Sequence, residues 1–252
     1  DAAKAALDKY GSGCAGSRFL NGTLDLHVQL EKELAEYIGK DETLCFSTGF
    51  FVNSGVLAVV VGRGDYIICD DRDHASIVDG RRLSFATQLH YKHNDMDDLE
   101  RVLKNLPHEA IKLIVVDGVF SMEGDLANLP KIVELKHKYN CSIMVDEAHG
   151  LGVFGKEGRG VCDYFGLTDE IDLIMGTFSK SMASIGGFIA GDKDTIFVIH
   201  AVHISLVRLT LLLLQQLLLR HCTSSRRSLS ALRNSGRLPI MHCDASRKKD
   251  LR

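Results

Sequence analysis

Residues 141–150, CSIMVDEAHG, and residues 171–181, IDLIMGTFSKS, are each a short apolar run that turns polar at its end. Apolar runs of this length are typical of buried β-strands. The first run ends at Asp146, and the second leads through small hydroxyl residues to Lys180. Open parallel sheets place their sites at the carboxyl ends of strands. The two stretches therefore predict that Asp146 and Lys180 belong to one site at such an edge.

The chemistry of these side chains predicts a pyridoxal phosphate site. A lysine amine can bond covalently to an aldehyde cofactor, and hydroxyls beside it can bind the phosphate. An aspartate at a strand end can keep a pyridinium nitrogen protonated, which makes the ring withdraw electrons. Lys180, Asp146, Thr177 and Ser179 supply these groups. The lysine segment or the aspartate segment alone is weak evidence, but the two together and in this order favour the cofactor site.

The rest of the chain alternates strand-like and helix-like segments up to about residue 190. Apolar residues repeat every three or four positions at 26–38 and at 96–106, which predicts two amphipathic helices. Strands are predicted at 66–69, 88–91, 111–116, 142–145, 173–175 and 187–190. This alternation predicts an α/β fold of three layers, in which helices cover a mainly parallel sheet.

A possible phosphate site precedes the helix-like stretch 52–61. Residues 47–50, STGF, lie just before it, so the backbone N–H groups of Gly49 and Phe50 would be placed at a helix N-terminus, where anions bind. An ordinary turn and helix cap is the other interpretation, and it is the better one for this segment taken alone.

Three further side chains are candidates. His74, in the motif DHAS, would stack on a cofactor ring or cap a helix; Ser121 would touch the cofactor or make a loop hydrogen bond. His149 would hydrogen-bond the cofactor's phenolic oxygen or lie in solvent. Their coincidence with Lys180 and Asp146 favours the cofactor site over these separate interpretations.

Longer motifs resemble the α-oxoamine synthases, which are fold-type I pyridoxal phosphate enzymes with an aminotransferase-like large domain. The motifs are YGSGCAGSRFLNGT at 10–23, DHAS at 73–76, DEAH at 146–149 and GTFSK at 176–180. The resemblance covers residues 1 to about 196. Residues 120–126 and 177–184 are most similar to bacterial members that condense L-serine with palmitoyl-CoA. The glycine C-acetyltransferase and 8-amino-7-oxononanoate synthase branches share the cofactor residues and remain alternatives.

The resemblance implies a decarboxylative condensation of an amino acid with an acyl-CoA, the first step of sphingolipid synthesis, by a homodimer with sites at the subunit interface. Lys180 would hold the cofactor and later remove the α-proton as a base. Asp146 would bind the ring nitrogen, and His74 would stack on the ring and help position the substrates. The residues implied to bind the cofactor are Lys180, Asp146, His149, His74, Ser121, Thr177, Ser179, Gly49 and Phe50.

Composition narrows the class of protein. A chain of 252 residues with 45% hydrophobic content and a net charge of -3 is ordinary for a soluble α/β protein and does not suggest a nucleic-acid surface. Its seven cysteines include no CxxC pair, which favours reduced thiols over disulfides or a metal site. Cysteine usage, together with the family resemblance, predicts a cytoplasmic protein with at most peripheral membrane association.

The charge balance changes sign near Ile196. Residues 197–252 carry ten basic and two acidic side chains, a net charge of +8, whereas residues 1–196 carry a net charge of -11. The family resemblance stops at this point, and back-translation of 221–240 with allowed codons, read one base earlier, can spell a sequence that resembles the family's next segment. We therefore expect a cofactor-binding large domain at 1–196, without the family's N-terminal arm. We expect 197–252 to be a frameshifted tail in place of a small domain, with Leu211 to Leu214 either exposed or only loosely packed.

Two other functional classes stay open. A non-catalytic subunit is conceivable, although the presence of Lys180, Asp146 and His74 argues against it. A membrane-binding protein would use the basic, leucine-rich tail, which requires that tail to be native; its apolar run at 206–219 is shorter than the roughly 20 residues that span a bilayer.

Overall fold

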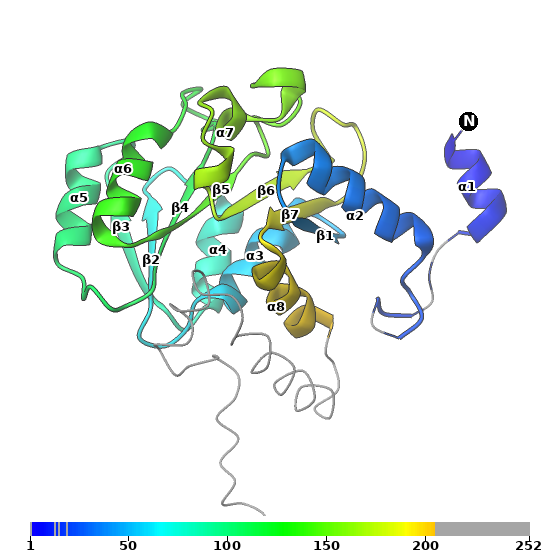
Figure 1. Ribbon diagram of the computed structural model, residues 1–252, viewed down its shortest axis with the longest axis horizontal. Coiled ribbons are helices and arrows are strands. Elements are labelled where there is room, and N and C mark those ends of the chain that lie inside the picture. Colours follow the sequence, from blue (N-terminus) through cyan, green and yellow to red (C-terminus); the bar gives the residue numbers. More distant parts are fainter. Residues whose placement is uncertain (1, 13, 15, 19, 205–252) are drawn as a thin grey trace, which may run out of the picture.

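The computed structural model describes residues 2–12, 14, 16–18 and 20–204. A seven-stranded sheet forms its centre, in the order β1-β7-β6-β5-β4-β2-β3 (Figure 1). The strands are β1 (Glu42–Phe46), β2 (Tyr66–Asp70), β3 (Thr87–Tyr91), β4 (Lys112–Asp117), β5 (Ser142–Asp146), β6 (Leu173–Thr177) and β7 (Gly187–Gly191). Among the described strands, β7 alone runs in the opposite direction to the others, so the predicted mainly parallel sheet is confirmed.

Helices cover both faces of this sheet. One apolar core lies under α2 (Asp25–Ile38), α5 (Met96–Lys104), α6 (Leu129–Tyr139) and α7 (Val161–Tyr164). A second core lies under α3 (Gly49–Val60), α4 (Ala75–Leu83) and α8 (Lys193–Ile204). Alternate strand residues feed the two cores, as Ile68 and Ile67 of β2 show. The predicted three layers are confirmed. The helix α1 (Ala2–Tyr10) has no buried residue and lies apart from the sheet (Figure 1).

Both predicted amphipathic helices form. The side chain of Asp95 caps α5 by accepting a hydrogen bond from the backbone N–H of Asp98. In α2 the apolar face is only partly covered: Leu34 and Ile38 are buried, but Leu26 and Leu30 are 46% and 40% exposed. The fourfold repeat therefore predicts the helix correctly, while half of its apolar face stays largely exposed.

The strand β1 is absent from the prediction. It pairs antiparallel with β7 at one edge of the sheet and is tied to α2 through Glu31. The Glu31 carboxylate accepts the backbone N–H of Cys45 at 2.9 Å and two hydrogen bonds from Arg18 at 2.7 and 2.9 Å. These contacts join segments distant in sequence, so a local pattern does not reveal them.

The described chain continues past Ile196. Ile196 and Ile199 of α8 are buried in the core shared with α3 and β7. Residues 205–252, including Leu211 to Leu214, lie outside the described residues, so the frameshifted tail and the boundary near Ile196 stay predictions. Within the described part, no helix combines the length and hydropathy that crossing a bilayer requires.

Candidate functional site

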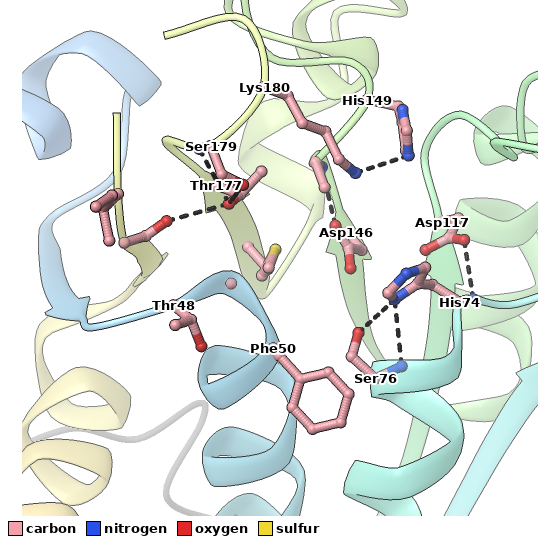
Figure 2. Close-up of a pocket in the computed structure, with 15 residues that line it drawn as sticks. Thr48, Phe50, His74, Ser76, Asp117, Asp146, His149, Thr177, Ser179 and Lys180 are labelled. Atoms are coloured by element: carbon pink, nitrogen blue, oxygen red, sulfur yellow. Dashed lines mark hydrogen bonds between the residues drawn. The ribbon is translucent and has the colours of Figure 1, made fainter. Parts of the chain in front are cut away.

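A cavity of about 320 Å³ lies where β4, β5 and β6 end (Figure 2). Its lining residues are Thr48, Gly49, Phe50, His74, Ser76, Asp117, Asp146, Ala148, His149, Met175, Thr177, Ser179, Lys180, Ile185 and Gly186. All the predicted cofactor residues are among them except Ser121. That side chain lies exposed in the loop after β4, and its role stays a prediction.

Asp146 ends β5 and is buried at the floor of the cavity. Parallel pairing sets it opposite Asp117 of β4 and Met175 of β6. Its Oδ1 accepts the backbone N–H of Ala148 at 2.9 Å, and its Oδ2 accepts Nδ2 of Asn53 at 2.7 Å. A carboxylate has about four lone-pair sites, so both oxygens keep capacity for a further donor. This arrangement fits a group that presents a protonated ring nitrogen.

Lys180 enters the cavity from the loop after β6. Its Nζ lies 2.7 Å from Nε2 of His149 (Figure 2). Desolvation lowers the pKa of Lys180 below its usual value, against the opposing effect of Asp146 and Asp117. Burial, and then the nearby lysine, lower the pKa of His149. The pair therefore favours a neutral imidazole that accepts a hydrogen bond from the amine.

The part of the cavity lined by Thr177, Ser179 and the start of α3 suits a phosphate. The Oγ1 of Thr177 lies 3.0 Å from Oγ of Ser179, and α3 begins beside them at Gly49. The first N–H groups of a helix lack partners within the helix, and the helix dipole favours an anion there. Thr48 caps this helix by accepting the backbone N–H of Phe51 at 3.1 Å.

Replacing Gly49 with alanine is expected to weaken cofactor binding. A Cβ at this position would lie 2.8 Å from Oγ1 and 3.0 Å from Cβ of Thr177, so either the threonine or the start of α3 must move. We expect the dissociation constant for pyridoxal phosphate to rise by about tenfold, a cost of about 1.4 kcal/mol. Absorbance titration measures it, with Ser54→Ala on the same helix as the control. An unchanged affinity would show that the phosphate lies elsewhere.

His74 caps α4 and also lines the cavity, so the interpretation as a helix cap is confirmed, while stacking on a cofactor ring stays a prediction. Its Nδ1 accepts the backbone N–H of Ser76 at 3.2 Å and lies 2.7 Å from Oγ of Ser76. Because a backbone N–H can only donate, Nδ1 carries no proton and the neutral ring is protonated at Nε2. The backbone N–H of His74 donates to Oδ2 of Asp117 at 3.0 Å.

Asp117 and Asp73 form a buried carboxyl pair beside this histidine. Oδ1 of Asp73 accepts the backbone N–H of Asp117 at 3.1 Å, and its Oδ2 accepts that of Asp70 at 3.0 Å. Burial, and then the charge of Asp146, raise the pKa of Asp117 to about 8. Burial also raises the pKa of Asp73 well above its usual value. Two strand-end carboxyls of the cavity, Asp117 and Asp146, thus lie side by side in different environments.

The free energy of unfolding of the Asp117→Asn variant, relative to that of wild type, is expected to increase as pH rises. Between pH 3.8 and about 8 the unfolded chain has lost this proton while the folded chain keeps it, so wild-type stability falls through that window. Asparagine removes the titration and can still accept the N–H of His74. The free energy of unfolding of Asp117→Asn relative to wild type should therefore increase from pH 5 to pH 8 in denaturant titrations. A pH-independent difference would mean that Asp117 is ionised throughout.

Several supporting residues were not among the predicted site residues: Asn53, Ser76, Asp73 and Asp117. The strand-end position of Asp117 and the motif DHAS were the available signals for three of them. Asn53 has no such signal, because it lies within the apolar stretch 52–61. Among the described residues, no group of three or more His, Cys, Asp or Glu side chains is arranged to hold a metal.

Comparison with known proteins places this chain in a family. The model of the aminotransferase class I and II family matches residues 1–234. A serine palmitoyltransferase of Bacteroides thetaiotaomicron is 78% identical over 191 residues, covering 76% of this chain and 48% of the relative. A serine palmitoyltransferase of Sphingobacterium spiritivorum is 59% identical over 196 residues, covering 78% and 49%. An 8-amino-7-oxononanoate synthase of Lysinibacillus sphaericus is 50% identical over 184 residues, covering 73% and 47%.

Solved structures with a similar fold include serine palmitoyltransferases. The serine palmitoyltransferase of Sphingomonas wittichii superposes with a TM-score of 0.77 at 45% identity, covering 79% of this chain and 50% of that one. That of S. paucimobilis, solved with PLP and myriocin bound, gives a TM-score of 0.77 at 41% identity with the same coverage. The chain spans about half the length of the curated relatives it matches. This chain belongs to the aminotransferase class I and II family, and its resemblance to the α-oxoamine synthases is confirmed by relatives that are bacterial serine palmitoyltransferases.

Proposed function

We propose that the cavity binds pyridoxal phosphate and serves the condensation of L-serine with palmitoyl-CoA, which gives 3-ketodihydrosphingosine, carbon dioxide and free CoA. The observation that carries the proposal is the convergence of Lys180 and Asp146, from the ends of neighbouring strands, on one cavity. The identity of 78% to serine palmitoyltransferases favours serine and a long acyl chain over the sister activities.

The side chains present fit this cofactor. Asp146 would hold the ring nitrogen, and Thr177, Ser179 and the N-terminus of α3 would hold the phosphate. Lys180 would provide the covalent attachment, and His74 would lie against the ring. When bound, the cofactor supplies an electron-withdrawing ring that stabilises negative charge at the α-carbon of the amino acid.

The chain's own residues then transfer the α-proton of the amino acid. Lys180 accepts the α-proton at Nζ, and its lowered pKa increases the fraction of neutral amine available near neutral pH. His149, 2.7 Å away, orients that nitrogen by accepting a hydrogen bond from it. His74 keeps its proton on Nε2, where it is available as a donor to a bound substrate.

The proposal is tested by product analysis of the chain loaded with pyridoxal phosphate. With L-serine and palmitoyl-CoA as substrates, it should form the long-chain amino ketone, which mass spectrometry detects. The yield should exceed that of the short-chain product formed from glycine and acetyl-CoA. A preference for glycine and acetyl-CoA would favour the glycine C-acetyltransferase branch. Cofactor binding without any product would favour a non-catalytic role, and no cofactor binding would defeat the proposal.

We further propose a homodimer that works in the cytoplasm. Support comes from apolar side chains left exposed on α2 and beside the cavity, including Leu26, Val28, Leu30, Phe50 and Phe51. Apolar side chains such as these lose their contact with water when a protein interface covers them. Sedimentation analysis should show a dimer; a monomer at micromolar concentration would contradict this part of the proposal.

A further inference from the structure

Asn53 lies behind the cavity, where it touches two of its walls. The residue is on α3, one turn after Gly49, and its exposed fraction is 0%. Its Nδ2 donates to Oδ2 of Asp146 at 2.7 Å and to Oγ of Ser76 at 2.8 Å. Both amide hydrogens are therefore used, and one side chain joins the end of β5 to the start of α4.

The line of hydrogen bonds continues to His74. Its Nδ1 lies 2.7 Å from Oγ of Ser76 and must be an acceptor, because it also receives the backbone N–H of Ser76. The Ser76 hydroxyl therefore donates to the ring and uses a lone pair to accept from Asn53. The amide thus connects Asp146 on one side of the cavity with His74 on the other.

Packing alone does not explain an amide at this position. The other large side chains on the buried face of α3 are apolar: Val52, Val56, Leu57 and Val59. The Oδ1 of Asn53 is buried without a hydrogen-bond partner among the described residues, which costs stability. An apolar side chain of the same size would avoid this cost, so the two donated hydrogen bonds are what distinguish the asparagine.

The approach of the two helices depends on Gly80 of α4. A Cβ at Gly80 would lie 2.8 Å from the backbone O of Asn53 and 3.1 Å from Cδ1 of Leu57. The missing side chain lets α4 pack closely on α3. This close packing brings Ser76, one turn earlier on α4, within hydrogen-bond reach of the amide.

We propose that Asn53 is a positioning residue that orients Asp146 and His74 together, from outside the cavity, for the group bound between them. The inference rests on the proposed function, because it assumes that these two side chains contact pyridoxal phosphate. Asn53 itself is not among the residues that line the cavity and would touch neither cofactor nor substrate.

Two near-isosteric variants of the cofactor-loaded chain test this role. Asn53→Leu removes both donors, so we expect the dissociation constant for pyridoxal phosphate to rise roughly ten- to hundredfold. Removal of the unpaired amide oxygen offsets only part of the stability that is lost with the two hydrogen bonds, so the affinity is measured at a temperature where the variant is folded. Asn53→Asp sets a second carboxyl against Asp146, and such a pair shares a proton when the pH is lowered. Its affinity relative to wild type should therefore recover from about pH 8 to about pH 5.5, whereas that of Asn53→Leu should not.

The ratio to wild type is the informative quantity, because every variant keeps the other titratable groups around this position. They are Asp146 at the end of β5, Asp117 at the end of β4, His74 before α4, His149 after β5 and Lys180 after β6. Ser54→Ala is the matched control: it removes a hydrogen bond from Oγ to the backbone O of Phe50 on the same helix and should leave the affinity unchanged.

The outcomes distinguish a failure of the role of Asn53 from a failure of the proposed function. If Asn53→Leu bound pyridoxal phosphate with wild-type affinity, the inference would be overturned. It would also be overturned if Ser54→Ala weakened cofactor binding equally, because the effect would then be due to the packing of α3. If Asn53→Leu fails to fold, the pH test on Asn53→Asp decides, and the absence of recovery on acidification would overturn the inference. If wild type itself does not bind pyridoxal phosphate, the proposed function fails instead.

Discussion

The Lys180→Ala variant should lose the exchange of the α-hydrogen of L-serine with solvent by a factor of about 10² to 10⁴, the usual contribution of a positioned base. The reason is geometric, since the Lys180 amine lines the cavity and is oriented by His149 at 2.7 Å. Proton NMR of serine in deuterated water with the cofactor-loaded protein measures this exchange directly, without requiring the acyl-CoA step.

The matched control for this experiment is Lys193→Ala. Lys193 is an exposed lysine whose nearest acid is Glu42 at 3.9 Å, so its removal should leave exchange at the wild-type rate. Exchange at the wild-type rate in Lys180→Ala would instead assign the base to another cavity residue, with His74 and His149 as the candidates.

The Asp146→Asn variant is expected to have the second largest effect. Both carboxylate oxygens face donors, the backbone N–H of Ala148 and Nδ2 of Asn53, so either orientation of the new amide sets its NH₂ group against another donor. The variant also lacks the negative charge that would hold a protonated ring nitrogen. We expect serine exchange to fall by about 10² to 10³, as when one preorganised electrostatic partner is removed, together with weaker cofactor binding.

Absorbance titration with pyridoxal phosphate and the exchange experiment measure the two effects. Asp79→Asn on α4 is the control, because the ion pair that Asp79 makes among the described residues is an exposed one, with Arg82 at 3.0 Å. Wild-type affinity and exchange in Asp146→Asn would show that the cofactor does not contact this strand end.

The sequence predicts the central part of the fold because its information there is local. Buried parallel strands read as apolar runs, and each one that ends in a polar residue also marks the cavity edge, as Asp146 does. The helix cap at Asp95 and the periodicity of α5 are similarly local. Lys180 and Asp146 come together because β5 and β6 are adjacent parallel strands, which the alternating pattern already favours.

The features that escape prediction depend on contacts between distant segments. The strand β1 needs β7 and Glu31 to hold it, and the reversed direction of β7 leaves no local signal. Asn53 sits in a run that is otherwise apolar, so its two hydrogen bonds emerge only when Gly80 allows α4 to approach α3.

The motif DEAH does not distinguish the roles of its two acidic residues, Asp146 and Glu147. Glu147 is fully buried, and its Oε1 accepts the backbone N–H of Cys162 at 2.7 Å. A Cβ at Gly150 or Gly160 would lie 2.0 or 2.5 Å from its carboxyl group, so the side chain fills the loop that follows β5. Two neighbouring acids thus have different tasks: Asp146 lines the cavity, and Glu147 packs the loop behind it.

Borohydride reduction after incubation with pyridoxal phosphate, followed by peptide mapping, is the most direct measurement of the proposed site. The cofactor label should be found on the peptide that contains Lys180, at one label per chain, and should be absent from Lys180→Ala. Label spread over exposed lysines such as Lys193, or no label at all, would contradict the assignment of this cavity as a pyridoxal phosphate site.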